Sequence, residues 1–217
     1  MKTKKQLLIF PFNGNGIEAL DCIVADKFSF IGFIDDKHAE KKNSNNWLIG
    51  GRELINIYPD ASILAVPGSP ESFHQRKEFI ESLGINSNRF VTIIHPSVSL
   101  GKNVSVGNNC LIMSGVTLTS NAVIGDHVCI LPHTVVHHDS TIAEYSLVGS
   151  NVCIAGNTHV GRNCYIGSGS NLINGISIGE YSLVGIGSNV LKSFPANSKI
   201  VGNPARNLID KNKMSNG

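Results

Sequence analysis

An aliphatic residue returns at every sixth position from Ile94 to Val190, and this spacing limits the folds that the chain can adopt. All seventeen positions of this series hold Ile, Leu or Val, and the register never changes. Neither the 3.6-residue period of a helix nor the two-residue period of a strand produces such spacing. A parallel β-helix of hexapeptide repeats does, with three hexads in each triangular coil of about eighteen residues. The repeat therefore predicts about five stacked coils, slightly over five by the number of hexads, with the aliphatic side chains, Cys110 and Cys164 inside.

A different pattern precedes the repeat, because residues 1–94 alternate short apolar runs with amphipathic segments. Such alternation is typical of a small parallel sheet covered by helices. We expect strands at Leu7–Phe10, Phe28–Ile34, Ser62–Val66 and Phe90–Ile94, and helices at Ile17–Ala25 and Glu71–Leu83. The predicted fold class is α/β followed by β. A small Rossmann-like domain spans residues 1–94, and a β-helix domain with a C-terminal hook and a polar tail spans residues 95–217.

A glycine motif follows the first predicted strand. Gly14-x-Gly16-x-x-Ala19 fits the dinucleotide fingerprint, and Asp35 comes 19 residues after the second glycine, at the end of the next strand. Such a turn brings backbone N–H groups and a helix N-terminus close to phosphates, while the carboxylate accepts hydrogen bonds from a sugar or base. The same glycines can also form a plain turn before a helix, and a full NAD domain needs about twice as many strands. The motif favours a compact nucleotide or nucleotide-sugar site over a dehydrogenase.

Composition and charge exclude several classes of protein. The chain has 18 Lys and Arg against 16 Asp and Glu, without a basic run, so we expect no nucleic-acid partner. Its five cysteines form no C-x-x-C pair, which indicates neither a disulfide framework nor a zinc knuckle and favours a cytoplasmic location. The apolar run at residues 7–10 stops at Pro11, too short for a signal peptide, and no run is long enough to insert into a membrane.

The unbroken hexads, the closing motif Val201–Arg206 and the small domain in front resemble the left-handed β-helix sugar acyltransferases. The chain is similar to the nucleotide-sugar N-acetyltransferases of the UDP-N-acetylbacillosamine type and to the sialic-acid O-acetyltransferase-like family, over residues 6–207. The resemblance implies left-handed coils, a homotrimer, and acetyl-CoA bound between adjacent β-helices, with no metal. It also implies transfer of an acetyl group to the 4-amino group of a nucleotide-linked 4-amino-4,6-dideoxy sugar.

The resemblance places the catalytic pair of the family in the segment at residues 135–140, with His138 as general base and Asp139 as its orienting partner. Eighteen residues further on, one predicted coil later, is Gly156, whose counterpart in the family donates its N–H to the thioester carbonyl. An imidazole with an ordinary pKa of ~6.5 can take a proton from an amine near neutral pH. His137 is the neighbouring alternative. Asp139 could also be a solvated turn residue in a polar column with the equivalent residues of adjacent coils.

The remaining site residues are also implied by the resemblance. The family's first loop usually contains a histidine, which the segment at residues 12–16 of this chain lacks. The expected acetyl-CoA contacts are Ala155, Gly156, Gly175, Gly187, Pro204 and Arg206. The expected substrate contacts are Asn13, Gly14, Asn15, Gly16, Asp35, Asp36, Gly68 and Ser69.

Three alternatives remain open from the sequence. The acceptor could be a sugar hydroxyl, because O-acetyltransferases share the fold. A γ-type carbonic anhydrase would use His133 and His138 as zinc ligands, but Ser97 occupies the position of the third. A β-helix without catalytic activity, acting as a scaffold or binding module, would not need the His-Asp pair. The other histidines, His127 and His159 among them, are expected to be surface or interface residues.

Overall fold

Two kinds of β-structure meet in this chain, which the computed structural model describes over residues 4–24, 27–37 and 47–208. The N-terminal part is a parallel sheet of four strands in the order β3-β2-β1-β4. The last four residues of β1 are buried, as expected for a central parallel strand covered on both faces. The strands are β1 (Lys5–Phe10), β2 (Phe28–Ile34), β3 (Leu48–Gly50) and β4 (Ser62–Ala65).

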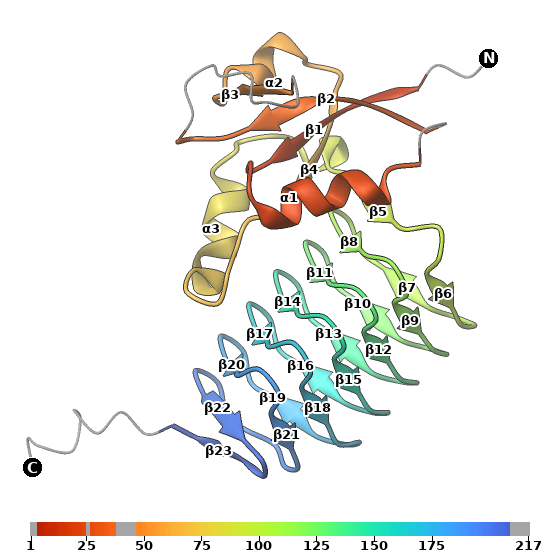
Figure 1. Cartoon of the computed structure of the whole chain (residues 1–217), viewed down its shortest axis with the longest axis vertical. Coiled ribbons are helices and arrows are strands. Elements are labelled where there is room, and N and C mark those ends of the chain that lie inside the picture. Colours follow the sequence, from red (N-terminus) through yellow and green to blue (C-terminus); the bar gives the residue numbers. More distant parts are fainter. Residues whose placement is uncertain (1–3, 25–26, 38–46, 209–217) are drawn as a thin grey trace, which may run out of the picture.

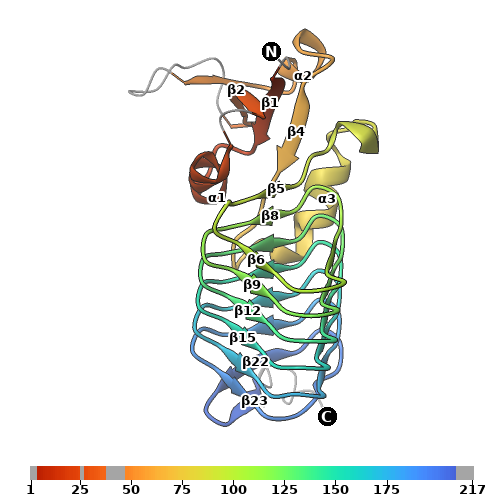
Figure 2. The same ribbon diagram turned by 90° about the vertical axis from the view of Figure 1, so that its right-hand side faces the viewer.

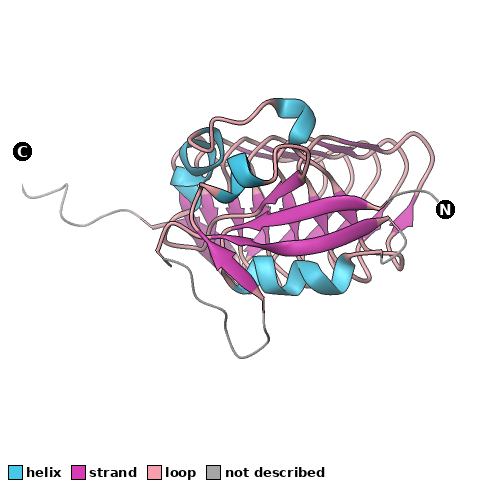
Figure 3. Ribbon diagram, turned by 90° about the horizontal axis from the view of Figure 1, so that it is seen from above, coloured by secondary structure: helices cyan, strands magenta, loops and turns pink. Residues whose placement is uncertain are grey.

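Short helices lie on both sides of this sheet, with α1 and α3 on opposite sides (Figure 2), and Figure 3 shows them flanking the strands from above. No helix in the described part of the chain is long and apolar enough to cross a membrane. Both predicted helical regions are present: the first begins and ends three residues earlier than expected, at Gly14 and Cys22, and the second is shorter, from Phe73 to Glu81. The helices are α1 (Gly14–Glu18), η1 (Ala19–Cys22), α2 (Leu54–Ile57), η2 (Phe73–Gln75), α3 (Arg76–Glu81) and η3 (Ser87–Arg89).

One predicted strand belongs elsewhere. The segment Phe90–Ile94 was expected to complete the small sheet, but only Ile93–Ile94 forms a strand, β5, and it pairs with the β-helix. Phe90 makes a single bridge to Ile63. The fourth strand of the small sheet is β3, whose three residues are too short to produce a periodic signal.

The second part is a left-handed parallel β-helix with three faces (Figure 1). The first face contains β5, β8 (Leu111–Ile112), β11 (Cys129–Ile130), β14 (Leu147–Val148), β17 (Tyr165–Ile166), β20 (Leu183–Val184) and β22 (Lys199–Gly202), with β23 (Ala205–Asn207) antiparallel at its end. The second face contains β6 (Ser99–Leu100), β9 (Thr117–Leu118), β12 (Val135–Val136), β15 (Cys153–Ile154), β18 (Asn171–Leu172) and β21 (Asn189–Val190). The third face contains β7 (Ser105–Val106), β10 (Val123–Ile124), β13 (Thr141–Ile142), β16 (His159–Val160) and β19 (Ser177–Ile178).

The predicted coil count is too low. The strands from β5 to β22, three to a turn, make six turns rather than about five. The final turn is two residues shorter, because Val184 pairs with Ile200 and Ile178 bridges to Phe194. The six-residue spacing therefore ends at Val190, partway through the last coil, which is completed by Phe194 and Ile200.

The interior of the β-helix is as the hexads predict. Every residue of the series from Ile112 to Val190 is buried, and so are Cys110 and Cys164. Leu100, in the first coil, is 50% exposed because no coil covers it from the N-terminal side. The aliphatic column thus supplies the core along the whole solenoid.

The small sheet packs on the first face of the β-helix. Leu7 and Ile9 of β1 share a buried cluster with Leu111, Cys129 and Leu147, whose side chains point outward from the first face. Within one chain the small part therefore covers the first face from β5 to β17. The edge between the second and third faces lies on the opposite side of the triangular coil.

Residues with left-handed backbone attach the small part to the edge between the third and first faces. Asn109 (φ 53°) exchanges hydrogen bonds with the backbone N–H and C=O of Ala65, at 2.8 and 2.9 Å. Asn163 (φ 50°) donates to the carbonyl oxygens of Phe73 and His74. Such corners favour Asn and Gly, and here they also carry the contacts between the two parts.

His127, at the same edge, makes the stability of the fold dependent on pH. Its ring stacks on Tyr145 with centroids 4.6 Å apart, and burial lowers the pKa of His127 below its ordinary value of 6.5. Below pH ~6.5 the unfolded chain therefore binds a proton that the folded chain resists. The free energy of unfolding should fall as the pH is lowered from about 7.5 to about 5, and His127→Phe should reduce this slope. Urea unfolding across that range, with His159→Phe as the control, measures it; an unchanged slope in His127→Phe contradicts the assignment.

Candidate active site

His138 and Asp139 lie together in the turn between β12 and β13, at the edge between the second and third faces. His138 Nδ1 is 2.7 Å from Asp139 Oδ2, and the second carboxylate oxygen accepts a hydrogen bond from Asn121 Nδ2 at 2.8 Å. Asp139 has left-handed backbone (φ 58°), a conformation that Asp and Asn tolerate better than most residues. The polar column through Asn121 is therefore present, and it supports the carboxylate that contacts the imidazole.

The electrostatics define the state of this pair. The hydrogen bond from His138 lowers the pKa of Asp139, and the bond from Asn121 adds to this effect. An ionised carboxylate favours a proton on the facing Nδ1 of a neutral imidazole, which leaves a lone pair on Nε2. The arrangement gives His138 an acceptor nitrogen directed away from Asp139.

Gly156 lies directly against that nitrogen. A Cβ atom at this position would be 2.6 Å from His138 Nε2 and 2.7 Å from Cε1, so any larger residue would displace the ring. Within the described part of the chain, the Gly156 N–H makes no hydrogen bond. The one-coil stacking expected from the sequence thus brings an imidazole acceptor nitrogen close to Gly156, whose backbone donor is unpaired among the described residues.

A cavity of about 450 Å³ opens at the carboxyl ends of β1, β2 and β4. This edge is where parallel α/β sheets bind their ligands. Asn15 lies beside the cavity in α1, with Nδ2 3.4 Å from the Gly68 carbonyl oxygen, and Gly14 and Gly16 lie in the same helix. The other sequence-predicted substrate residues all line the cavity: Asn13, Asp35, Asp36, Gly68 and Ser69.

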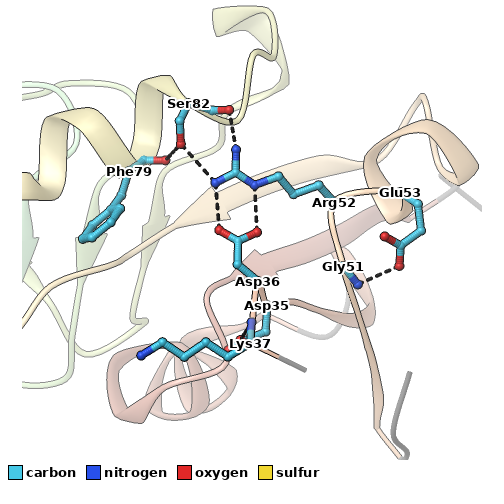
Figure 4. A network of polar contacts seen from close by, with 8 residues as sticks. All are labelled: Asp35, Asp36, Lys37, Gly51, Arg52, Glu53, Phe79 and Ser82. Carbon is cyan, nitrogen blue, oxygen red and sulfur yellow. Dashed lines mark hydrogen bonds and ion pairs between the residues drawn. The ribbon is translucent and has the colours of Figure 1, made fainter. Parts of the chain in front are cut away.

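The two adjacent carboxylates differ in their surroundings (Figure 4). Asp35 is buried and accepts hydrogen bonds from the backbone N–H groups of Phe12 and Lys37, at 3.1 and 2.7 Å. Asp36 forms a two-pronged ion pair with Arg52, at 2.7 and 2.8 Å, and this lowers the pKa of Asp36.

Arg52 was not singled out from the sequence. It also donates to the carbonyl and hydroxyl oxygens of Ser82, beyond α3. Arg52 therefore joins the end of β2 to the end of α3 at the rim of the cavity. No local pattern signals this pairing, because Asp36 and Arg52 are separated by a segment that includes β3.

The cavity also has an aromatic wall that the sequence analysis missed. Phe10, Phe12 and Phe79 line it, and the Phe12 ring packs on Phe33 with centroids 5.1 Å apart. Flat apolar rings of this kind suit stacking against a nucleobase. The signal in the sequence is the pair of rings in Phe10-Pro-Phe12 at the end of β1.

The residues expected to contact acetyl-CoA are not all at one place. Ala155, Gly156 and Gly175 lie along the same edge as His138. Gly187 lies at the edge between the first and second faces, and Pro204 and Arg206 lie in the hairpin of β22 and β23. The structure therefore brings three of the six to the His138 edge.

Two other features do not coincide with this site. A larger cavity, of about 750 Å³, lies on the third face and contains neither His138 nor the predicted substrate residues. His133, a ligand in the carbonic anhydrase alternative, lies at a different edge from His138, with its ring against Gly115. Among the described residues, no group of three His, Cys, Asp or Glu side chains is placed to hold a metal ion.

The Bacterial transferase hexapeptide (six repeats) model matches residues 121–156, which include His138, Asp139 and Gly156. Over these residues the chain is similar to the hexapeptide-repeat transferases. UDP-N-acetylbacillosamine N-acetyltransferase of Bacillus subtilis (strain 168) is 32% identical to this chain over 85 residues. That match covers 37% of this chain and 38% of the Bacillus protein, so it spans well under half of either.

Solved structures share the fold of this chain over nearly its whole length. A histidine-to-asparagine variant of perosamine N-acetyltransferase from Caulobacter crescentus, in complex with CoA and GDP-perosamine, superimposes with a TM-score of 0.83 at 21% identity, over 95% of this chain and 97% of that one. The acetyltransferase domain of PglB from Neisseria gonorrhoeae, in complex with acetyl coenzyme A, gives 0.82 at 22% identity, over 95% and 100%. Both parts of the chain, the small sheet and the β-helix, thus occur together in these proteins.

Proposed function

We propose that this chain is an acetyl-CoA-dependent N-acetyltransferase acting on the 4-amino group of a nucleotide-linked 4-amino-4,6-dideoxy sugar. The observation that carries the proposal is the contact of His138 with both Asp139 and Gly156. The cavity at the end of the small sheet supports a nucleotide-linked acceptor. The names of similar proteins support the same chemistry, since one acetylates a UDP-linked sugar and another was solved with CoA and GDP-perosamine.

The chemistry assigns one role to each residue of the site. The neutral amine attacks the thioester carbonyl carbon, and His138 Nε2 takes the proton that the amine loses. Asp139 holds the ring and stabilises the imidazolium that forms. The Gly156 N–H donates to the carbonyl oxygen as it gains negative charge. The C–N bond forms, the C–S bond breaks, and the CoA thiolate leaves with the proton carried by His138, so no acyl-enzyme is required.

The positions of the two sites support an active site shared between copies of the chain. The cavity belongs to the small sheet, which covers the first face, whereas His138 lies at the edge opposite that face. A nucleotide sugar in the cavity of one copy would therefore meet His138 of another. We propose a homotrimer with acetyl-CoA between adjacent β-helices, a cytoplasmic location, and a division of labour between residues 1–94, which bind the nucleotide sugar, and residues 95–217, which carry out transfer.

A mixture of two inactive variants tests the shared site. His138→Ala removes the base, and Ser69→Trp fills the cavity that Ser69 lines. If each site takes its histidine from one copy and its cavity from another, refolding the two variants together should restore about a quarter of wild-type activity. Activity no higher than that of either variant alone would place both halves of the site in one copy. Each variant refolded alone is the control.

The function itself is tested by acetyl-CoA turnover. Release of free thiol is followed with UDP-, dTDP- and GDP-linked 4-amino sugars, and the product is analysed by mass. We expect release with one of the three nucleotides and a product heavier by one acetyl group on the amine. If no amino sugar gives thiol release and a sugar with a hydroxyl acceptor does, the reaction is O-acetylation and the proposed N-acetylation is wrong.

A further inference from the structure

Arg76, the first residue of α3, is fully buried between the small part and the β-helix. Its guanidinium donates to three backbone carbonyl oxygens, one from each of three segments. Nε reaches Tyr145 at 2.8 Å, Nη2 reaches His127 at 2.7 Å, and Nη1 contacts Pro67. Arg76 therefore ties the loop after β4 to two coils of the β-helix.

The charge of this group has no anionic partner. Among the residues that the structure describes, no carboxylate forms an ion pair with Arg76. An arginine side chain remains protonated in proteins, and burying a cation without an anion costs free energy that carbonyl dipoles offset only in part. The positive charge of Arg76 is therefore not neutralised by any carboxylate of the described residues, and it can act on an anion bound close by.

The loop above Arg76 is a wall of the cavity. Pro67, Gly68 and Ser69 line the cavity on one side, and a Cβ atom on Gly68 would lie 2.9 Å from Arg76 Cγ on the other. Gly68 has φ +121°, a conformation that glycine adopts readily, and this lets the backbone lie flat on the arginine stem. A single layer of backbone thus separates the guanidinium from whatever binds at this loop.

We propose that Arg76 is a positioning and specificity residue whose buried charge selects the anionic diphosphate of the acceptor. The inference rests on the proposed function, which places a nucleotide-linked sugar in this cavity. Arg76 acts through the Pro67–Ser69 loop and does not touch the ligand. Because the guanidinium is shielded from solvent, its attraction for a diphosphate is weakened by salt much less than that of a surface lysine.

The test compares ligands that differ in charge. Binding of UDP, dTDP and GDP to the full chain is measured by calorimetry, and the nucleoside of the tightest one is measured by competition against it. Arg76→Gln should weaken binding of the nucleoside diphosphate about tenfold or more while changing nucleoside binding much less. Arg76→Lys should largely keep the preference for the diphosphate, because it keeps the charge.

Arg89 provides the matched control. It too donates to three backbone carbonyl oxygens, those of Ile55, Tyr58 and Ala61, but at the opposite end of the small sheet from the cavity. Arg89→Gln should lower the Tm without altering the ratio of the two affinities. If Arg76 has only a structural role, Arg76→Gln should likewise lower the Tm and leave the ratio of the two affinities unchanged.

The outcomes separate this inference from the proposed function. If wild type binds none of the three nucleoside diphosphates, the proposed acceptor is wrong and the inference is overturned with it. If wild type binds one, and Arg76→Gln weakens nucleoside and nucleoside diphosphate equally or neither, only the role of Arg76 is overturned. If Arg76→Gln does not fold, Arg76→Lys provides the test. A folded lysine variant that has lost the preference for the diphosphate over the nucleoside would show that the positive charge is not the cause of that preference.

Discussion

Replacing His138 with alanine is expected to lower kcat by about 10²- to 10⁴-fold while the protein stays folded and assembled. The side chain is exposed and its polar contact is with Asp139 at the surface of one turn, so its removal leaves the aliphatic core untouched. Steady-state thiol release measures kcat, with the acceptor that gives turnover in the panel of nucleotide-linked amino sugars. Circular dichroism and gel filtration verify the fold and the assembly.

The neighbouring His137 is the control for this substitution. It precedes His138 in the same turn, and His137→Ala should keep turnover within a few-fold of wild type. Near-wild-type turnover in His138→Ala, or a large loss in His137→Ala alone, would move the base to His137 or remove the base from the mechanism. The pair of variants thus separates the two adjacent imidazoles, which the sequence could not do.

Adding one methyl group at Gly156 is expected to lower kcat by about 10²-fold. The new Cβ would lie 2.6 Å from His138 Nε2, so the imidazole must rotate or shift away from its place beside the Gly156 N–H. A displacement of about 1 Å in a catalytic group can cost this much, because the proton acceptor no longer faces the reacting amine. Turnover of Gly156→Ala at saturating substrate measures the effect, and its KM for acetyl-CoA shows whether the thioester still binds.

Gly115 offers a matched control within the same chain. The His133 ring lies against Gly115 in the same way, but at another edge of the β-helix, so Gly115→Ala also forces an imidazole aside. Its left-handed backbone (φ 69°) adds a modest strain, so the Tm should fall while kcat remains close to wild type. Equal losses of kcat in the two alanine variants would indicate damage to the solenoid rather than to the site.

These two predictions bear on different parts of the mechanism. His138→Ala removes the proton acceptor, whereas Gly156→Ala keeps the imidazole and disturbs its position and the adjacent N–H. A strong effect of the first with a weak effect of the second would leave general-base catalysis in place and assign stabilisation of the carbonyl oxygen to another donor. A large loss of kcat in both variants would support the conclusion that His138, Asp139 and Gly156 act together in catalysis.

Much of the fold could be predicted from local patterns. The six-residue series from Ile112 to Val190 forms the core because each coil repeats the environment of the one before, so the same volume must be filled at each turn. The small parallel sheet was also expected, with β1, β2 and β4 close to their predicted bounds. The partner of a short strand is set by contacts distant in sequence, and for this reason β3 was missed and Ile93–Ile94 was assigned to the wrong sheet.

The same distinction holds for the candidate site: some of its contacts follow from residue spacing, and others depend on segments distant in sequence. The stacking of His138 on Gly156 follows from the length of one coil, so counting residues was enough to predict it. The ion pair of Asp36 with Arg52, the aromatic wall at Phe12 and the burial of Arg76 all depend on how separate segments meet around the cavity. No sequence pattern within any one of those segments predicts these contacts.

Residue spacing alone predicts the β-helix, its register and the position of the His-Asp pair on an edge, because in a solenoid each contact is with a residue one coil away. The packing of the small sheet on the first face, which puts its cavity and His138 on opposite sides of one chain, could be seen only in the folded structure. That arrangement depends on outward-facing residues such as Leu111 and Leu147 and on left-handed corners such as Asn109 and Asn163. Side chains on the outside of a coil are not constrained by the repeat, so only packing against another part of the chain shows what they do.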